Sequence, residues 1–84
     1  MIRAADVRRL VLEHPFKPFR ICLTDGRHFD VFDPTWTLVA EARLSVGIAP
    51  KDDPESELPD RHVHIDYKTI ARLEPLSATK SVSI

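Results

Sequence analysis

The chain has 84 residues, of which 43% are hydrophobic and 30% charged, and its formal net charge is −1. These values are typical of a globular domain rather than a disordered chain, and the length allows one hydrophobic core without a separate catalytic domain. The near-neutral charge argues against a free nucleic-acid binder, because contacts with phosphates normally require a basic surplus.

Charge and cysteine content bear on the compartment and the partners. Residues 1–20 contain five basic and two acidic residues, whereas residues 51–60 contain five acidic residues and one lysine. The one cysteine, Cys22, cannot form an internal disulfide and is typical of a reducing compartment. No stretch approaches the roughly 18 apolar residues of a membrane span, and no basic-then-apolar leader opens the chain. We therefore expect a soluble cytoplasmic protein with no membrane partner.

The N-terminal residues predict a short amphipathic helix. Apolar side chains recur there at helical spacing, namely at Ala4, Val7, Leu10 and Val11. Pro15 disfavours a helical conformation at His14, so the helix is expected to end near Glu13. In the proline-containing connector that follows, extended backbone would place Phe16 and Phe19 on opposite sides, with Phe19 in the core.

From Phe19 onwards the apolar period changes to two, which predicts a series of short strands. Phe19, Ile21 and Leu23 are expected to face the core. Asp25-Gly26 predicts a hairpin with a type I′ turn, in which both central residues have positive φ. Further alternating segments are expected at 28–32, 36–41, 44–48, 62–67 and 70–75, with an exposed loop at 49–60.

This order of elements predicts a mainly β fold with one N-terminal helix. The expected architecture is a small, strongly bent antiparallel barrel of five or six strands, because closure removes exposed strand edges at this size. Residues 1–76 would form the single domain, and residues 77–84 a frayed C-terminal tail.

The segments FRICLTDGRHFDVFDPTWTLV and HIDYKTIARLEP, preceded by a helix, resemble the Sm-like fold and are most similar to its bacterial RNA-chaperone branch. In that family, subunits join edge to edge into rings, and RNA bases stack between subunits near the ring's centre. The resemblance implies an RNA site in which an aromatic ring stacks on a base, a lysine contacts phosphate, and a carboxylate accepts from a base edge. The matching positions are Asp33, Trp36, Tyr67 and Lys68.

The sequence departs from that family at several points. Thr69 stands where the chaperone branch has a histidine, the 49–60 loop is long and acidic, and Pro34-Thr35 shifts the spacing before Trp36. Trp36 also alternates with Leu38, which favours a core-filling role, and Lys68 fits a solvated turn. The segment PFKPFRICLTDGRHFDV additionally resembles small bacterial proteins to which no function is assigned.

The histidines are the best candidates for metal chemistry. His62 and His64 share one face of a predicted strand, where side chains project about 6–7 Å apart and can chelate one ion. A third ligand, His28 or Asp30, would be available only if the two strands are neighbours. The alternative is the exposed polar face of a half-buried strand.

No motif indicates an enzyme or a cofactor. Cys22 alternates with Ile21 and Leu23, as expected for a small buried hydrophobic residue. The chain has only two glycines and therefore no phosphate-cradling loop. Two functions remain: a non-catalytic module that self-associates or docks a protein partner through an open strand edge, and an RNA-binding Sm-like ring.

Overall fold

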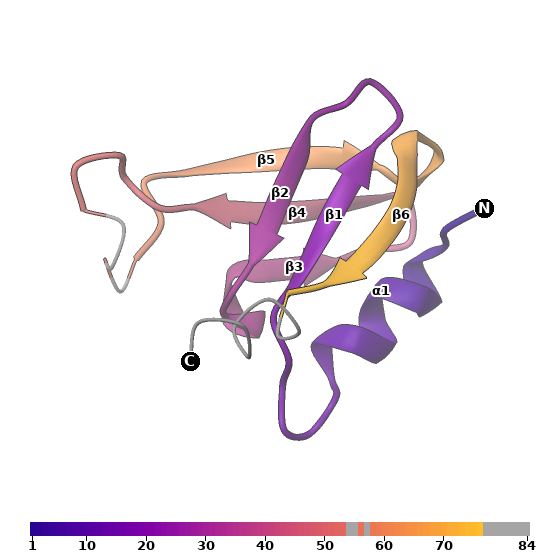
Figure 1. Cartoon of the computed structure of the whole chain (residues 1–84), viewed down its shortest axis with the longest axis horizontal. Helices are drawn as coiled ribbons and strands as arrows, with labels where there is room; N and C mark the ends of the chain where they lie inside the picture. The colour runs from indigo at the N-terminus through magenta and orange to yellow at the C-terminus, as the bar shows by residue number, and fades with distance from the viewer. Residues whose placement is uncertain (54–55, 57, 77–84) are drawn as a thin grey trace.

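Two antiparallel three-stranded sheets form the body of the protein in the computed structural model, which describes residues 1–53, 56 and 58–76. The first sheet has the order β2-β1-β6 and the second β3-β4-β5, and the strands of the two sheets cross at a steep angle (Figure 1). The strands are β1 (Phe19–Leu23), β2 (His28–Val31), β3 (Thr37–Val39), β4 (Arg43–Ile48), β5 (Arg61–Asp66) and β6 (Ile70–Pro75). The helical elements are α1 (Ala4–Val11) and two 3₁₀ turns, η1 (Pro34–Trp36) and η2 (Tyr67–Thr69).

The mainly β fold with one N-terminal helix is confirmed. The expected barrel closure is not confirmed, because no ladder within the described residues joins the two sheets. The predicted tail at 77–84 lies outside the described residues, as do residues 54, 55 and 57 of the predicted loop.

Helix α1 is short and depends on tertiary packing. Its first turn is closed by the Asp6 carboxylate, which accepts a hydrogen bond from the Arg3 N–H at 2.9 Å. Val7 is fully buried and belongs to the core, and α1 packs against β3. The predicted stripe therefore docks the helix on the second sheet, since two helical turns are not stable alone.

The β1–β2 hairpin forms as predicted, but its turn type was wrong. The Gly26 N–H donates to the Leu23 carbonyl at 3.1 Å, and the Leu23 N–H donates to the Arg27 carbonyl at 2.8 Å. Only Gly26 has positive φ, at 94°, so the connection is a three-residue loop rather than a type I′ turn. Asp25 stabilises it by accepting from the Arg27 N–H at 3.0 Å, a hydrogen bond that lowers the pKa of the Asp25 carboxyl.

The core lies between the two sheets. Its buried residues come from α1, from β1, β2, β4 and β5, and from η2 and the first residue of β6: Val7, Phe19, Ile21, Leu23, Val31, Leu44, Val46, Ile65, Tyr67 and Ile70. Cys22 is also buried, as expected. Phe16 and Phe19 do not lie on opposite sides of the connector, because their ring centroids are 6.2 Å apart in an edge-on contact.

Candidate functional site

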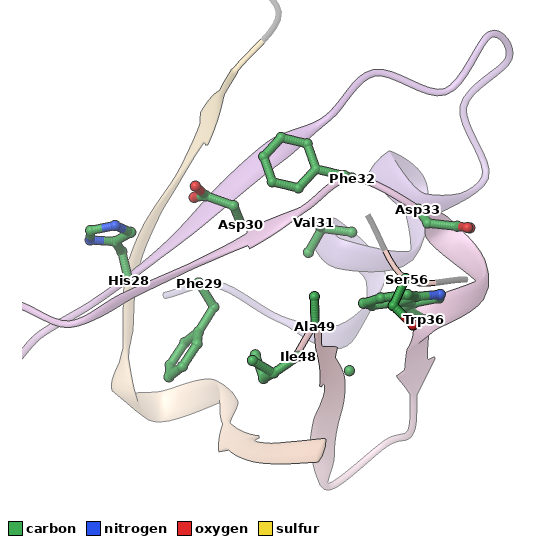
Figure 2. Close-up of a pocket in the computed structure, with 11 residues that line it drawn as sticks. His28, Phe29, Asp30, Val31, Phe32, Asp33, Trp36, Ile48, Ala49 and Ser56 are labelled. Atoms are coloured by element: carbon green, nitrogen blue, oxygen red, sulfur yellow. The ribbon is translucent and has the colours of Figure 1, made fainter. Parts of the chain in front are cut away.

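An open, mainly apolar pocket of about 450 Å³ lies beside β2. Phe29 and Val31 of β2 point toward Ile48 and Ala49 at the end of β4, and Trp36 of η1 borders the same space (Figure 2). Phe29 is only partly buried, although it sits on the core-facing side of its strand. The pocket therefore exposes apolar surface that belongs to the same side of the sheet as the core.

The opposite side of β2 carries a masked charge and an exposed aromatic ring. Arg20 donates to both carboxylate oxygens of Asp30, with Nε–Oδ1 at 2.7 Å and Nη2–Oδ2 at 3.2 Å. Hydrogen bonding to Asp30 raises the pKa of Arg20 further above its ordinary value. Phe32 follows β2 directly and is 64% exposed. Because the bidentate contact neutralises Asp30, this side of the strand carries little net charge.

Among the residues that the structure describes, one backbone edge of β2 has no partner strand. In this part of the chain β2 pairs with β1 alone, with Ile21 opposite Phe29 and Cys22 opposite His28. Hydrogen-bonded and non-hydrogen-bonded residue pairs alternate along an antiparallel ladder. Because Leu23 and Arg27 are hydrogen-bonded, every second pair counted from them is hydrogen-bonded as well. Phe29 and Val31 therefore bond to β1. The N–H and C=O groups of His28 and Asp30 point away from β1, toward the free edge.

Two of the four residues predicted to bind RNA lie together. The Asp33 carboxylate caps η1 by accepting from the N–H of Thr35 at 2.9 Å and from its hydroxyl at 2.7 Å. Trp36 ends the same 3₁₀ turn and is half-buried outside the core cluster, contrary to the core-filling alternative. Both residues border the pocket beside β2.

The other two residues, Tyr67 and Lys68, lie in η2 between β5 and β6. Tyr67 is 6% exposed, and its hydroxyl donates to the Ala40 carbonyl at 2.6 Å. Burial also raises the pKa of the Tyr67 phenol. The ring therefore has no free face within the chain, contrary to the stacking role implied by the resemblance. Lys68 is exposed, and its N–H donates to the Asp66 carboxylate at 3.0 Å, as expected for a solvated turn residue.

The predicted metal ligands are not brought together. His62 and His64 lie on β5, whereas His28 and Asp30 lie on β2 in the other sheet, so the two strands are not neighbours. His64 Nδ1 is instead 2.8 Å from the hydroxyl of Ser45 on β4. Within residues 1–53, 56 and 58–76, no group of three histidine, cysteine or carboxylate side chains could hold a metal ion.

The sequence does not predict the pocket beside β2. The alternating pattern puts Phe29 on the same strand face as Val31, and Ile48 in line with Leu44 and Val46. It carried no signal that the space between β2 and the end of β4 stays open, since these strands are distant in sequence. The one available signal is Phe32, an aromatic residue that the alternation places on the strand face of His28 and Asp30, opposite Phe29 and Val31.

No helix in the described part of the chain is long and apolar enough to cross a membrane. No model of a known protein family, no curated protein and no solved structure matches this chain.

Proposed function

We propose that the protein is a non-catalytic interaction module that binds an extended protein segment along the free edge of β2. On this proposal the scaffold is a small β fold of the Sm-like or SH3-like kind. The observation that carries the proposal is the coincidence of two features: outward backbone groups at His28 and Asp30, and an apolar pocket beneath Phe29 and Val31. In strand addition, main-chain hydrogen bonds supply affinity, and pockets for alternate side chains supply specificity.

The remaining sheet edges are less suited to strand addition. β3 is three residues long, and α1 packs against it. β6 ends in Pro75 and carries an exposed ion pair between Arg72 and Glu74. β5 presents exposed ionisable side chains, at Arg61, His62, His64 and Asp66. Short strands, charges and proline are the usual means by which edges are protected from pairing, and β2 has the weakest protection because Arg20 masks its one carboxylate.

The bound segment has a defined chemistry on this proposal. Its side chains alternate between the two sides of the extended sheet, so every second residue faces the pocket. Those residues are apolar, to match Phe29, Ile48 and Trp36. The intervening residues lie beside Phe32 and the Arg20–Asp30 pair, where an uncharged side chain fits and an ionisable one needs a hydrogen-bonding or oppositely charged partner.

Peptide selection with two substitutions at one position tests the proposal. A displayed library of extended peptides is selected on the immobilised protein, and binders are measured against His28→Pro and His28→Ala. Proline removes the outward N–H without taking a hydrogen bond from the β1 ladder, whereas alanine keeps the N–H and removes only the side chain. We expect His28→Pro to weaken binding about tenfold, the upper range for one hydrogen bond, and His28→Ala to bind normally. A selection without binders, or binders that are insensitive to His28→Pro, would overturn the proposal.

The alternative function is an RNA-binding Sm-like ring, and the observation that favours it is the half-buried Trp36 beside Asp33. The burial of Tyr67 and the formal net charge of −1 argue against it. Fluorescence polarisation with oligo-U and oligo-A at low salt decides between the two. RNA binding that Trp36→Ala abolishes would support the RNA-binding alternative. The absence of binding at protein concentrations of about tens of micromolar would exclude it.

A further inference from the structure

We infer that the strand that docks on β2 is β2 of a second copy of this chain, in a symmetric antiparallel dimer with Phe29 on the two-fold axis. This inference rests on the proposed function, because it names the occupant of the same edge. Three independent properties of β2 support it: the direction of its free backbone groups, its charge pattern and the position of Phe29.

The backbone pattern permits this register. With Phe29 on the axis, His28 lies opposite the second copy's Asp30, and symmetry creates the same pair again. The outward N–H and C=O groups on β2 are those of His28 and Asp30. Each such pair can exchange two N–H···O=C hydrogen bonds, as hydrogen-bonded pairs of an antiparallel ladder do. This uses all the backbone groups of β2 that have no partner among the described residues.

The charges favour the same register. A carboxylate that faces an imidazole accepts a hydrogen bond from the neutral ring and pairs with the protonated one. The competing register with Asp30 on the axis loses both His28–Asp30 pairs and places the two Arg20-bound carboxylates opposite each other with no donor between them. Arg20 lies on the same face and already holds Asp30, so the carboxylate is in place to accept from the second copy's His28.

Phe29 supplies the apolar part of the interface. It points to the pocket side of β2 and is only partly buried within one chain (Figure 2). On the axis, the two Phe29 residues form a non-hydrogen-bonded pair, the kind in which opposite side chains approach most closely, with Cα atoms about 4.5 Å apart. The rings then cover each other beside the open pockets, which buries apolar surface that one chain leaves in water.

A four-residue edge makes a small interface, so the dimer is weak. Stable complexes bury much more surface than one strand pair provides. We therefore expect a monomer–dimer equilibrium with a dissociation constant on the order of 10–100 µM.

Disulfide trapping tests the register directly. Phe29→Cys places two thiols in a facing pair whose Cα separation suits a disulfide, whereas His28→Cys places them diagonally, about 7–8 Å apart and at the limit of reach. With oxidised glutathione, we expect Phe29→Cys to form a covalent dimer at least several times faster than His28→Cys. Wild type is the background control, since its Cys22 is 7% exposed. Equal trapping at both positions, or none at Phe29→Cys, would overturn the register.

Sedimentation equilibrium tests the dimer without an added cysteine. His28→Asp places a carboxylate opposite the second copy's Asp30 and should raise the dissociation constant at least tenfold. His62→Asp makes the same change at an exposed strand histidine of the other sheet and should leave the equilibrium unchanged. Circular dichroism confirms that both variants are folded. A wild-type monomer up to about 1 mM would overturn the inference.

The two proposals fail separately. A monomeric wild type that still selects extended peptides sensitive to His28→Pro keeps the edge as a docking site and removes only the second copy as its occupant. A monomer that selects no peptide overturns both proposals.

Discussion

Replacing Tyr67 with phenylalanine removes one part-buried hydrogen bond and little packing volume. The hydroxyl donates to the Ala40 carbonyl at 2.6 Å and thereby links η2 to the residue that follows β3. A hydrogen bond of this kind contributes about 0.5–1.5 kcal/mol to the free energy of unfolding. The hydrogen bond is part-buried, so water partly replaces the lost donor at the Ala40 carbonyl. We therefore expect a loss of about 1 kcal/mol, or about 4–8 °C in Tm for a domain of this size.

The cost of Tyr67→Phe should depend on pH in one direction. Burial raises the pKa of Tyr67 above its ordinary value of 10.0 in the folded protein. Below pH 10 the phenol is neutral in both states, and its contribution to stability is complete. Above pH 10 the unfolded chain releases the proton first, so wild type loses stability that the phenylalanine variant never had. The stability difference between the two proteins should therefore shrink as the pH rises from 10 through the folded pKa.

Chemical denaturation at a series of pH values measures this difference, with the fluorescence of the single tryptophan as the signal. Ultraviolet absorbance of tyrosinate reports the pKa without ambiguity, because the chain contains one tyrosine. Other alkaline groups titrate equally in both proteins and cancel in the comparison. An unchanged Tm at neutral pH, or a difference that stays constant above pH 10, would refute the assignment of Tyr67 as a buried donor.

Three further changes have defined outcomes. Gly47→Ala should cost about 1–3 kcal/mol in urea denaturation by overpacking, because a Cβ there would lie 2.9 Å from Cβ of Pro59. Val7→Ala should cost about 1.5–3 kcal/mol, the value of a fully buried valine, and a loss below about 0.5 kcal/mol would contradict the docking of α1. Zinc should leave Tm unchanged in differential scanning fluorimetry, since His62 and His64 have no third ligand on a neighbouring strand; a rise that His62→Ala removes would contradict this.

The alternation of apolar residues predicts the individual strands of this fold well, but it does not predict how the strands pair into sheets. The period-two alternation predicts the strands around Ile21 and Ile65, and both of these residues are buried. The hairpin at Asp25-Gly26 was recognised, but its turn type depended on whether Thr24 joins the loop, and an Asp-Gly pair is compatible with both loop lengths. Sheet closure was not predictable, because the pairing partners of an edge strand are set by tertiary packing rather than by its own residues.

The candidate site illustrates the same limit. Alternation places Phe29 on one strand face with Val31, because it reports which side of a strand a residue occupies. It does not report whether another element covers that side. Exposure of Phe29 depends on where Ile48 and Ala49 end the second sheet, and nothing in the residues of β2 specifies that position. Tyr67 shows the converse, since a short motif match placed it in an RNA site, whereas its burial makes it a structural donor.

The open edge of β2 has a local cause in Asp33-Pro34. Pro34 lacks a backbone N–H, and the Asp33 carboxylate instead caps η1 through Thr35, so the chain leaves the first sheet immediately after Val31. It then enters the second sheet at β3, which pairs with β4 and not with β2. The same break therefore ends the strand, exposes Phe32 and leaves the outward groups of Asp30 unpaired. A docking edge arises here because a capped proline turn directs the following strand into the other sheet.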